Sequence, residues 1–168
     1  MKVIILAGGH GTRLSEYTKL VPKPMVKVGK LPIIVHIMKH YLKYGFNDFI
    51  IATGYKKEVF KKYFKGYKKT GEPFLSKIKN YNWRNNILDT GLKTLTGGRL
   101  KRASKYLNKK DENFMFTYGD GVSNVNLKQL IEFHKKHKKK ITVTAVRPPA
   151  RFGELKLNKN LVQSFKEK

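Results

Sequence analysis

Short apolar runs alternate with segments of helical period along this chain. Residues 3–7 form a continuous apolar run that ends in glycines, as a buried parallel strand does, and a second run covers residues 49–52. Between the two runs, apolar side chains recur with the spacing of one helix face over residues 33–42, directly after Pro32, a residue suited to the first turn of a helix. The alternation predicts an α/β fold in which helices connect the strands of a sheet.

The remainder of the chain continues this alternation. Apolar residues on one face predict a helix that opens at Gly98, and Asn126 is placed to cap another helix. Predicted strands cover residues 86–89, 114–117, 141–146, 154–157 and 161–166, and a short basic helix covers residues 56–64. Residues 66–86 carry no clear pattern. No internal repeat or domain boundary is evident, so residues 1–168 are interpreted as one domain.

Charge widens the range of candidate partners. Lysine and arginine together number 37 against 11 acidic residues, a formal net charge of +26. Such a balance is typical of proteins that bind nucleic acids or anionic membranes. However, 31 of the 37 basic residues are lysines scattered over every segment, whereas base recognition relies on arginine. The pattern favours a solvated lysine-rich surface without a nucleic-acid partner, and it predicts attraction of anionic substrates that weakens with salt.

Cysteine and hydropathy exclude further classes. The chain has no cysteine, which excludes disulfides and thiolate metal sites. No stretch approaches the roughly 18 consecutive apolar residues of a membrane span. We therefore expect a cytoplasmic protein without a membrane partner.

The strongest local signal is the sequence GGHGTRL at residues 8–14, directly after the first predicted strand. Three glycines in four positions expose backbone N–H groups and let a phosphate approach closely. The loop matches neither a Walker loop nor a dinucleotide fingerprint. It contains Arg13, whose guanidinium suits polyphosphate oxygens. The alternative is a tight turn with a surface arginine.

Two further residues are candidates for phosphate chemistry. Lys23 stands between Pro22 and Pro24, which predicts an extended, pre-organised backbone that holds one positive charge in place. The alternative is a rigid linker with an exposed lysine. Asp120 follows a predicted strand and is flanked by glycines, so its carboxylate is expected at the end of the sheet where such folds bind ligands. The alternative is an ordinary turn aspartate.

Taken together, GGHGTRL and the PKPM segment resemble the nucleoside-diphosphate-sugar pyrophosphorylases. The segments LDTG at 88–91, TGGRLKR at 96–102, FTYGDGV at 116–122 and PPARFG at 148–153 are similar to the glucose-1-phosphate cytidylyltransferase branch. The resemblance covers essentially the whole chain, although residues 66–86 form a shorter segment than is usual in that branch. It implies a Rossmann-like, mainly parallel sheet flanked by helices in a single nucleotidyltransferase domain, truncated at the C-terminus.

The resemblance also implies a reaction and its participants. CTP and glucose 1-phosphate would give CDP-glucose and pyrophosphate with Mg²⁺ as cofactor, and the full-length protein would be a homo-oligomer. The implied catalytic residues are Arg13, Lys23 and Asp120, with Asp120 as metal ligand and a second aspartate beyond residue 168. The implied nucleotide-binding residues are Leu6, Ala7, Gly8, Gly9, His10, Gly11, Thr12, Arg13, Lys23, Thr94, Gly98 and Arg99. The implied sugar-phosphate-binding residues are Gly153, Glu167 and Lys168.

Three alternatives stay open at this point. Uridylyl- and thymidylyltransferases share the opening loop, so the base is not fixed by it. A catalytically incomplete nucleotide-binding fragment and a basic nucleic-acid-binding protein are the other two.

Overall fold

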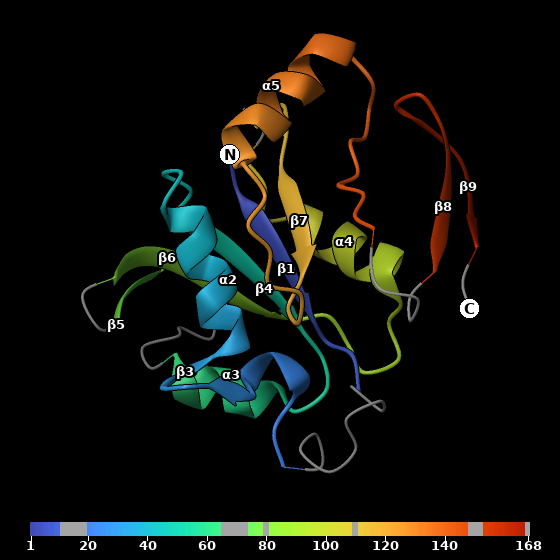
Figure 1. Cartoon of the computed structure of the whole chain (residues 1–168). Coiled ribbons are helices and arrows are strands. Elements are labelled where there is room, and N and C mark those ends of the chain that lie inside the picture. The colour runs from blue at the N-terminus through green and yellow to red at the C-terminus, as the bar shows by residue number, and fades with distance from the viewer. Residues whose placement is uncertain (11–19, 65–73, 79–80, 109–110, 148–152, 167–168) are drawn as a thin grey trace. The chain divides into compact units, whose positions relative to one another are not determined.

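The computed structural model describes residues 1–10, 20–64, 74–78, 81–108, 111–147 and 153–166 (Figure 1). The chain separates into two compact units, Met1–Asn124 and Val125–Lys168, which are described in turn. The interpretation of residues 1–168 as one domain stays a prediction.

A five-stranded sheet forms the centre of the first unit, in the order β5-β6-β4-β1-β7. The strands are β1 (Val3–Ala7), β4 (Asp48–Thr53), β5 (Phe74–Ile78), β6 (Tyr81–Asp89) and β7 (Met115–Tyr118). Every neighbouring pair is parallel except β5 and β6, which are antiparallel. The predicted α/β fold with a mainly parallel sheet is confirmed. Strand β6 is longer than predicted, and β5 lies in the segment without a clear pattern.

Both faces of the sheet are covered, which explains the uninterrupted apolar character of β1. Ile4 and Leu6 belong to one buried cluster with Ala103 of helix α4 (Thr96–Ser104), against which the partly buried Leu100 also packs. Val3 is the register partner of Phe49 on the neighbouring strand β4. The Phe49 ring meets Tyr41 of helix α2 (Ile33–Leu42) edge-on, with 6.4 Å between ring centroids. Figure 1 shows α2 and α4 on opposite faces of the sheet.

The helices of the first unit begin within a few residues of the predicted positions. They are α2 (Ile33–Leu42), α3 (Lys57–Tyr63) and α4 (Thr96–Ser104). Pro32 caps α2 rather than beginning it, and α4 starts two residues before Gly98. The predicted loop before α2 contains a 3₁₀ turn, η2 (Lys23–Met25), and two short strands, β2 (Lys27–Val28) and β3 (Leu31–Pro32).

The second unit consists of helix α5 (Leu127–His137) and a hairpin of strands β8 (Glu154–Asn158) and β9 (Leu161–Lys166). Asn126 caps α5 as predicted, because its side chain accepts a hydrogen bond from Gln129 N at 3.2 Å. None of the helices in the described part of the chain has the length and apolar character required to span a lipid bilayer.

The strand predicted at residues 141–146 is absent from the described structure. Its β-branched residues favour a strand, but a strand also needs a hydrogen-bonding neighbour, and the described residues supply none. Instead, Thr142 Oγ1 lies 2.7 Å from a ring nitrogen of both His134 and His137. These contacts hold the start of the segment against the end of α5.

Candidate active site

The order of the strands places a pocket in the first unit. After β1 the chain moves outward through β4 and β6, and then returns to add β7 on the other side of β1. The strand order therefore reverses between β1 and β7, and open α/β sheets bind ligands at the carboxyl ends of the strands at such a topological switch point. A cavity of about 260 Å³ lies there, lined by Leu6, Ala7, Gly8, Gly9, Lys23, Pro24, Thr94, Leu95, Thr96, Arg99, Tyr118 and Asp120.

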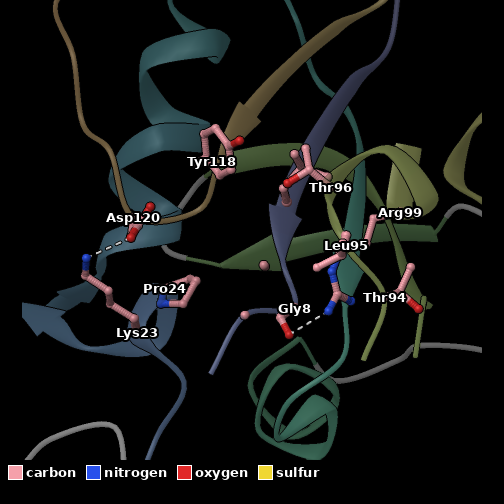
Figure 2. Close-up of a pocket in the computed structure, with 12 residues that line it drawn as sticks. Gly8, Lys23, Pro24, Thr94, Leu95, Thr96, Arg99, Tyr118 and Asp120 are labelled. Atoms are coloured by element: carbon pink, nitrogen blue, oxygen red, sulfur yellow. Dashed lines mark hydrogen bonds and ion pairs between the residues drawn. The ribbon is translucent and has the colours of Figure 1, made fainter. Parts of the chain in front are cut away.

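An ion pair forms one side of this pocket. Lys23 Nζ lies 2.8 Å from a carboxylate oxygen of Asp120, and both side chains are partly exposed, at 29% and 37%. Figure 2 shows the pair on one side, with Thr94, Leu95 and Thr96 on the other and Gly8 between them. Phosphate groups and cations could therefore be bound on the side of the ion pair.

The backbone conformation predicted for Lys23 is wrong. Lys23 begins the 3₁₀ turn η2 and only Pro22 before it is extended, with φ −65° and ψ 146°. Two backbone hydrogen bonds close the turn, from Met25 N to Pro22 O at 2.7 Å and from Val26 N to Lys23 O at 3.1 Å. The lysine is still held by a defined backbone, but hydrogen bonds of the turn hold it in addition to the prolines.

Asp120 is positioned by the end of β7. Gly119 N donates to Leu6 O at 2.9 Å, which continues the parallel pairing of β1 and β7 by one residue. The turn that follows therefore starts from a backbone fixed against β1. Asp120 therefore lies at the carboxyl end of the sheet, as the sequence predicts, and it lines the same pocket as Gly8 and Gly9.

The glycine loop rests on a buried arginine. Arg99, which is 5% exposed, reaches from α4 to the loop. Its Nη2 donates to Gly8 O at 2.9 Å and to Leu92 O at 3.3 Å. Its Nη1 donates to Thr53 O at 3.1 Å and to Thr90 Oγ1 at 2.6 Å. All four hydrogens of the two terminal nitrogens are thus donated to protein oxygens, so Arg99 supports the pocket through Gly8.

The charge of Arg99 remains even though the group is buried. Burial lowers the pKa of its guanidinium, and the positive charge of Arg102 lowers it further. A guanidinium nevertheless stays protonated in proteins. Among the described residues its hydrogen bonds go to neutral oxygens, so its positive charge is not neutralised by a bonded carboxylate. The charge beneath the glycine loop favours an anion in the pocket.

Alanine at position 8 is expected to destabilise the protein, whereas alanine at position 9 is not. A Cβ on Gly8 would lie 2.0 Å from Arg99 Nη1, while a Cβ on Gly9 would meet nothing within 4 Å. The guanidinium can move away only by giving up buried hydrogen bonds, which cost about 1 to 3 kcal/mol when lost. Urea unfolding should therefore show a free energy of unfolding for Gly8→Ala that is lower than that of Gly9→Ala by about 1 to 2 kcal/mol. Equal stability of the two variants would contradict the contact between Arg99 and the loop.

The side of the pocket opposite the ion pair is formed by the segment before α4. Leu95 is 83% exposed and Tyr118 of β7 is 55% exposed, and both line the pocket. Thr94, which precedes Leu95 and also lines the pocket, accepts a hydrogen bond from Arg102 at 2.7 Å. Exposed apolar surface next to hydroxyl groups suits a flat ring with polar edges.

The structure brings most of the described predicted residues together. Eight of them line the pocket: Leu6, Ala7, Gly8, Gly9, Lys23, Thr94, Arg99 and Asp120. His10 instead lies against Tyr55, with 4.9 Å between ring centroids. Gly98 lies in α4 behind Thr94, where a Cβ would come within 2.8 Å of Thr94 Cγ2. A side chain at position 98 would therefore press on Thr94, which lines the pocket.

Several predicted residues have no described position at the pocket. Gly11, Thr12, Arg13, Glu167 and Lys168 lie outside the described residues. Gly153 directly precedes β8 in the second unit. The roles assigned to these six residues stay predictions.

Sequence reasoning missed four pocket residues, namely Pro24, Leu95, Thr96 and Tyr118. Pro24 and Tyr118 are direct neighbours of the predicted Lys23 and of the Gly119–Gly121 turn, so position alone could have indicated them. Leu95 and Thr96 lie between the predicted Thr94 and Gly98. For Leu95, the signal in the sequence was an isolated apolar residue within a polar segment, which could have indicated a contact with a ligand.

Among the residues that the structure describes, the pocket offers one carboxylate, that of Asp120, to a metal ion. Among the described residues no group of three or more His, Cys, Asp or Glu side chains is close enough to hold a metal. Asp120 is already paired with a cation, the Lys23 ammonium, so this position favours positive charge. Mg²⁺ is commonly bound through one or two carboxylates together with substrate phosphates and water. The residues present fit a Mg²⁺ ion that a polyphosphate ligand helps to hold.

Comparisons with known proteins agree with this chemistry. The family model for nucleotidyl transferases matches residues 2–168. The chain is 48% identical to the glucose-1-phosphate cytidylyltransferase of Salmonella typhimurium over 178 aligned residues, which cover 100% of this chain and 69% of that protein. It is 36% identical to a mannose-1-phosphate guanyltransferase of Aspergillus fumigatus, over 91% of this chain and 40% of that protein. HddC from Yersinia pseudotuberculosis, solved in complex with GMP-PN, is similar with a TM-score of 0.74 at 26% identity, covering 99% of this chain and 69% of that one.

Proposed function

The chain belongs to the nucleotidyl transferase family, and on that premise we propose that it transfers a cytidylyl group from CTP to glucose 1-phosphate. The products are CDP-glucose and pyrophosphate. The observation that carries the proposal is the convergence of the glycine loop, Lys23 and Asp120 on one pocket at the switch point of the sheet. The 48% identity to a glucose-1-phosphate cytidylyltransferase supports the choice of CTP and of glucose 1-phosphate.

Each group of the pocket has a part in binding the triphosphate. The backbone of Gly8 and Gly9 admits the phosphates closely, because no Cβ stands in the way. Lys23 binds the α-phosphate, and the buried charge of Arg99 adds attraction from beneath the loop. Arg13, for which the sequence is the only support, stabilises the departing pyrophosphate.

The reaction is an in-line displacement at phosphorus. A phosphate oxygen of glucose 1-phosphate forms a bond to the α-phosphorus of CTP, and the bond from that phosphorus to the oxygen bridging to the β-phosphate breaks, so that pyrophosphate leaves with that electron pair. Such a reaction needs alignment and charge neutralisation more than a protein nucleophile. Mg²⁺ held by Asp120 would supply part of that neutralisation. Lys23 and the glycine loop keep the α-phosphate aligned for the attack.

The remaining parts of the proposal depend on the resemblance. Gly153, Glu167 and Lys168 are assigned to the sugar phosphate, and a second aspartate beyond residue 168 is assigned to the metal. We also propose a cytoplasmic homo-oligomer, with no nucleic acid or membrane as a partner. The scattered lysines raise the local concentration of anionic substrates, which predicts weaker CTP binding at high salt.

CTP with Mg²⁺ is expected to raise the melting temperature more than ATP with Mg²⁺ does. A ligand that binds only the folded state at about a hundred times its Kd adds about 2.7 kcal/mol, or roughly 5 to 10 °C for a chain of this size. Differential scanning fluorimetry with CTP, UTP and ATP checks this. A separate binding assay, which measures retention of a labelled nucleic-acid duplex at physiological salt, is the control for binding driven by charge alone. Equal shifts with CTP and ATP, or retention of the duplex without a CTP shift, would contradict the proposal.

A further inference from the structure

The two members of the ion pair in the pocket belong to segments that lie far apart in the sequence. Lys23 begins the 3₁₀ turn η2, whereas Asp120 follows the end of β7. Pro24, which follows Lys23, and Gly119, which precedes Asp120, are both buried, and Figure 2 shows Pro24 beside the ion pair. Each charged residue is therefore next to a buried residue that fixes where its segment lies.

The ring of Pro24 packs against Gly119 so closely that it leaves no room for a side chain there. A Cβ on Gly119 would lie 2.9 Å from Pro24 Cγ, 3.1 Å from Pro24 Cβ and 3.2 Å from Leu6 O. None of these atoms belongs to a flexible side chain, because the proline ring is closed onto its own backbone and Leu6 O accepts the hydrogen bond from Gly119 N. An added methyl group would therefore push η2 away from the end of β7.

The glycine on the other side of Asp120 has no such contact. A Cβ on Gly121 would meet nothing within 4 Å. Neither Gly119 nor Gly121 has a positive φ, so alanine would not be strained in the backbone at either position. The two glycines differ in the space around them, and only Gly119 requires the absence of a side chain for packing.

We propose that Gly119 and Pro24 are positioning residues, whose contact sets the separation between the Lys23 ammonium and the Asp120 carboxylate. The inference rests on the proposed function, in which Lys23 binds the α-phosphate and Asp120 would hold Mg²⁺. Because each positioning residue is bonded directly to one of these two, a shift between the segments moves one charge relative to the other. A misplacement of about 1 Å is enough to cost up to a hundredfold in the rate of an aligned reaction.

Calorimetric titration with CTP, once with Mg²⁺ and once with EDTA in its place, tests the proposal on Gly119→Ala. The deciding quantity is the gain in affinity from Mg²⁺, which is the Kd in EDTA divided by the Kd in Mg²⁺. Lys23 and Asp120 act together on one ligand only when the metal is present, so Gly119→Ala should reduce this gain by about fivefold or more. Gly121→Ala is the matched control and should keep the wild-type gain within about twofold. A general loosening of the fold would weaken CTP binding under both conditions and leave the gain unchanged.

Pro24→Ala provides a second test. It removes Cγ, the atom nearest to the methyl group that Gly119→Ala adds, so the two substitutions should compensate in part. The gain from Mg²⁺ in the double variant should be at least as large as in Gly119→Ala alone, whereas losses from unrelated causes would add. Urea unfolding shows whether each variant is folded. If Gly119→Ala does not fold, Pro24→Ala alone decides, because the loosened contact should itself reduce the gain by about twofold or more.

The outcomes separate this inference from the proposed function. Equal gains in Gly119→Ala and Gly121→Ala, additive losses in the double variant, or an unchanged gain in Pro24→Ala would overturn the inference, while CTP binding by the wild-type chain still supported the proposed function. A wild-type chain that binds CTP without any gain from Mg²⁺ would also overturn the inference alone. A wild-type chain that does not bind CTP would refute the proposed function, and the inference with it.

Discussion

Replacing Asp120 by asparagine is expected to lower turnover by about a hundredfold or more while leaving the stability of the fold nearly unchanged. The amide keeps the size of the side chain but removes the charge that would bind Mg²⁺, and preorganised electrostatic groups of this kind contribute factors of about 10² to 10³. The pair of Asp120 with Lys23 is partly exposed, and such pairs add only about 0 to 1 kcal/mol to stability. Pyrophosphate release from CTP and glucose 1-phosphate, followed beside urea unfolding, measures both quantities.

Glu58→Gln is the matched control for this substitution. Glu58 is also an exposed acid paired with a lysine, at 3.4 Å from Lys61 on α3, but it does not line the pocket. Its amide variant should retain normal turnover. Near-normal turnover in Asp120→Asn, or an equal loss in Glu58→Gln, would refute the role assigned to Asp120.

Replacing Arg99 by methionine is expected to destabilise the protein by about 2 to 4 kcal/mol, because buried acceptors lose their partner. The carbonyls of Gly8 and Thr53 both accept hydrogen bonds from the guanidinium. The same substitution removes the positive charge beneath the glycine loop, so the affinity for CTP should fall by about tenfold or more. Urea unfolding measures the first effect, and calorimetric titration with CTP below the unfolding transition measures the second.

Arg84→Met controls for the loss of an arginine elsewhere in the same sheet. Arg84 is exposed. In the strand register it lies beside Asp48, the first residue of β4, at the end of the strands opposite to the pocket. This variant should keep both its stability and its CTP affinity. If Arg99→Met unfolded at the same urea concentration as Arg84→Met, the four hydrogen bonds of Arg99 would not stabilise the fold as expected.

Local patterns in the sequence predict much of the sheet and part of the site. The apolar run of β1 ends at glycines because the strand is buried on both faces and the chain then turns at its carboxyl end. Asp120 could be identified because it follows β7 between glycines, and parallel strands bring their carboxyl ends to one edge. The helical spacing in α4 likewise predicts the face that packs against Ile4 and Leu6.

Contacts between distant segments could not be predicted in this way. Arg99 donates hydrogen bonds to Gly8 and Thr53, which lie 91 and 46 residues earlier in the chain. The periodicity of the sequence gives no indication of these contacts. The supporting role of Arg99 is therefore visible only in three dimensions. The prediction of a strand at residues 141–146 is wrong for a related reason. Strand propensity is a property of the local sequence, whereas hydrogen bonding to a neighbouring strand depends on distant residues. The 3₁₀ turn at Lys23 depends on hydrogen bonds that the flanking prolines do not specify.

The most direct test of the central claim is a crystal structure of this chain with CTP and Mg²⁺. The convergence of the glycine loop, Lys23 and Asp120 predicts that the triphosphate lies in the pocket between them, with Lys23 Nζ on the α-phosphate and Asp120 on the metal. A nucleotide whose phosphates lie outside this pocket, with the 2.8 Å pair of Lys23 and Asp120 intact, would contradict it.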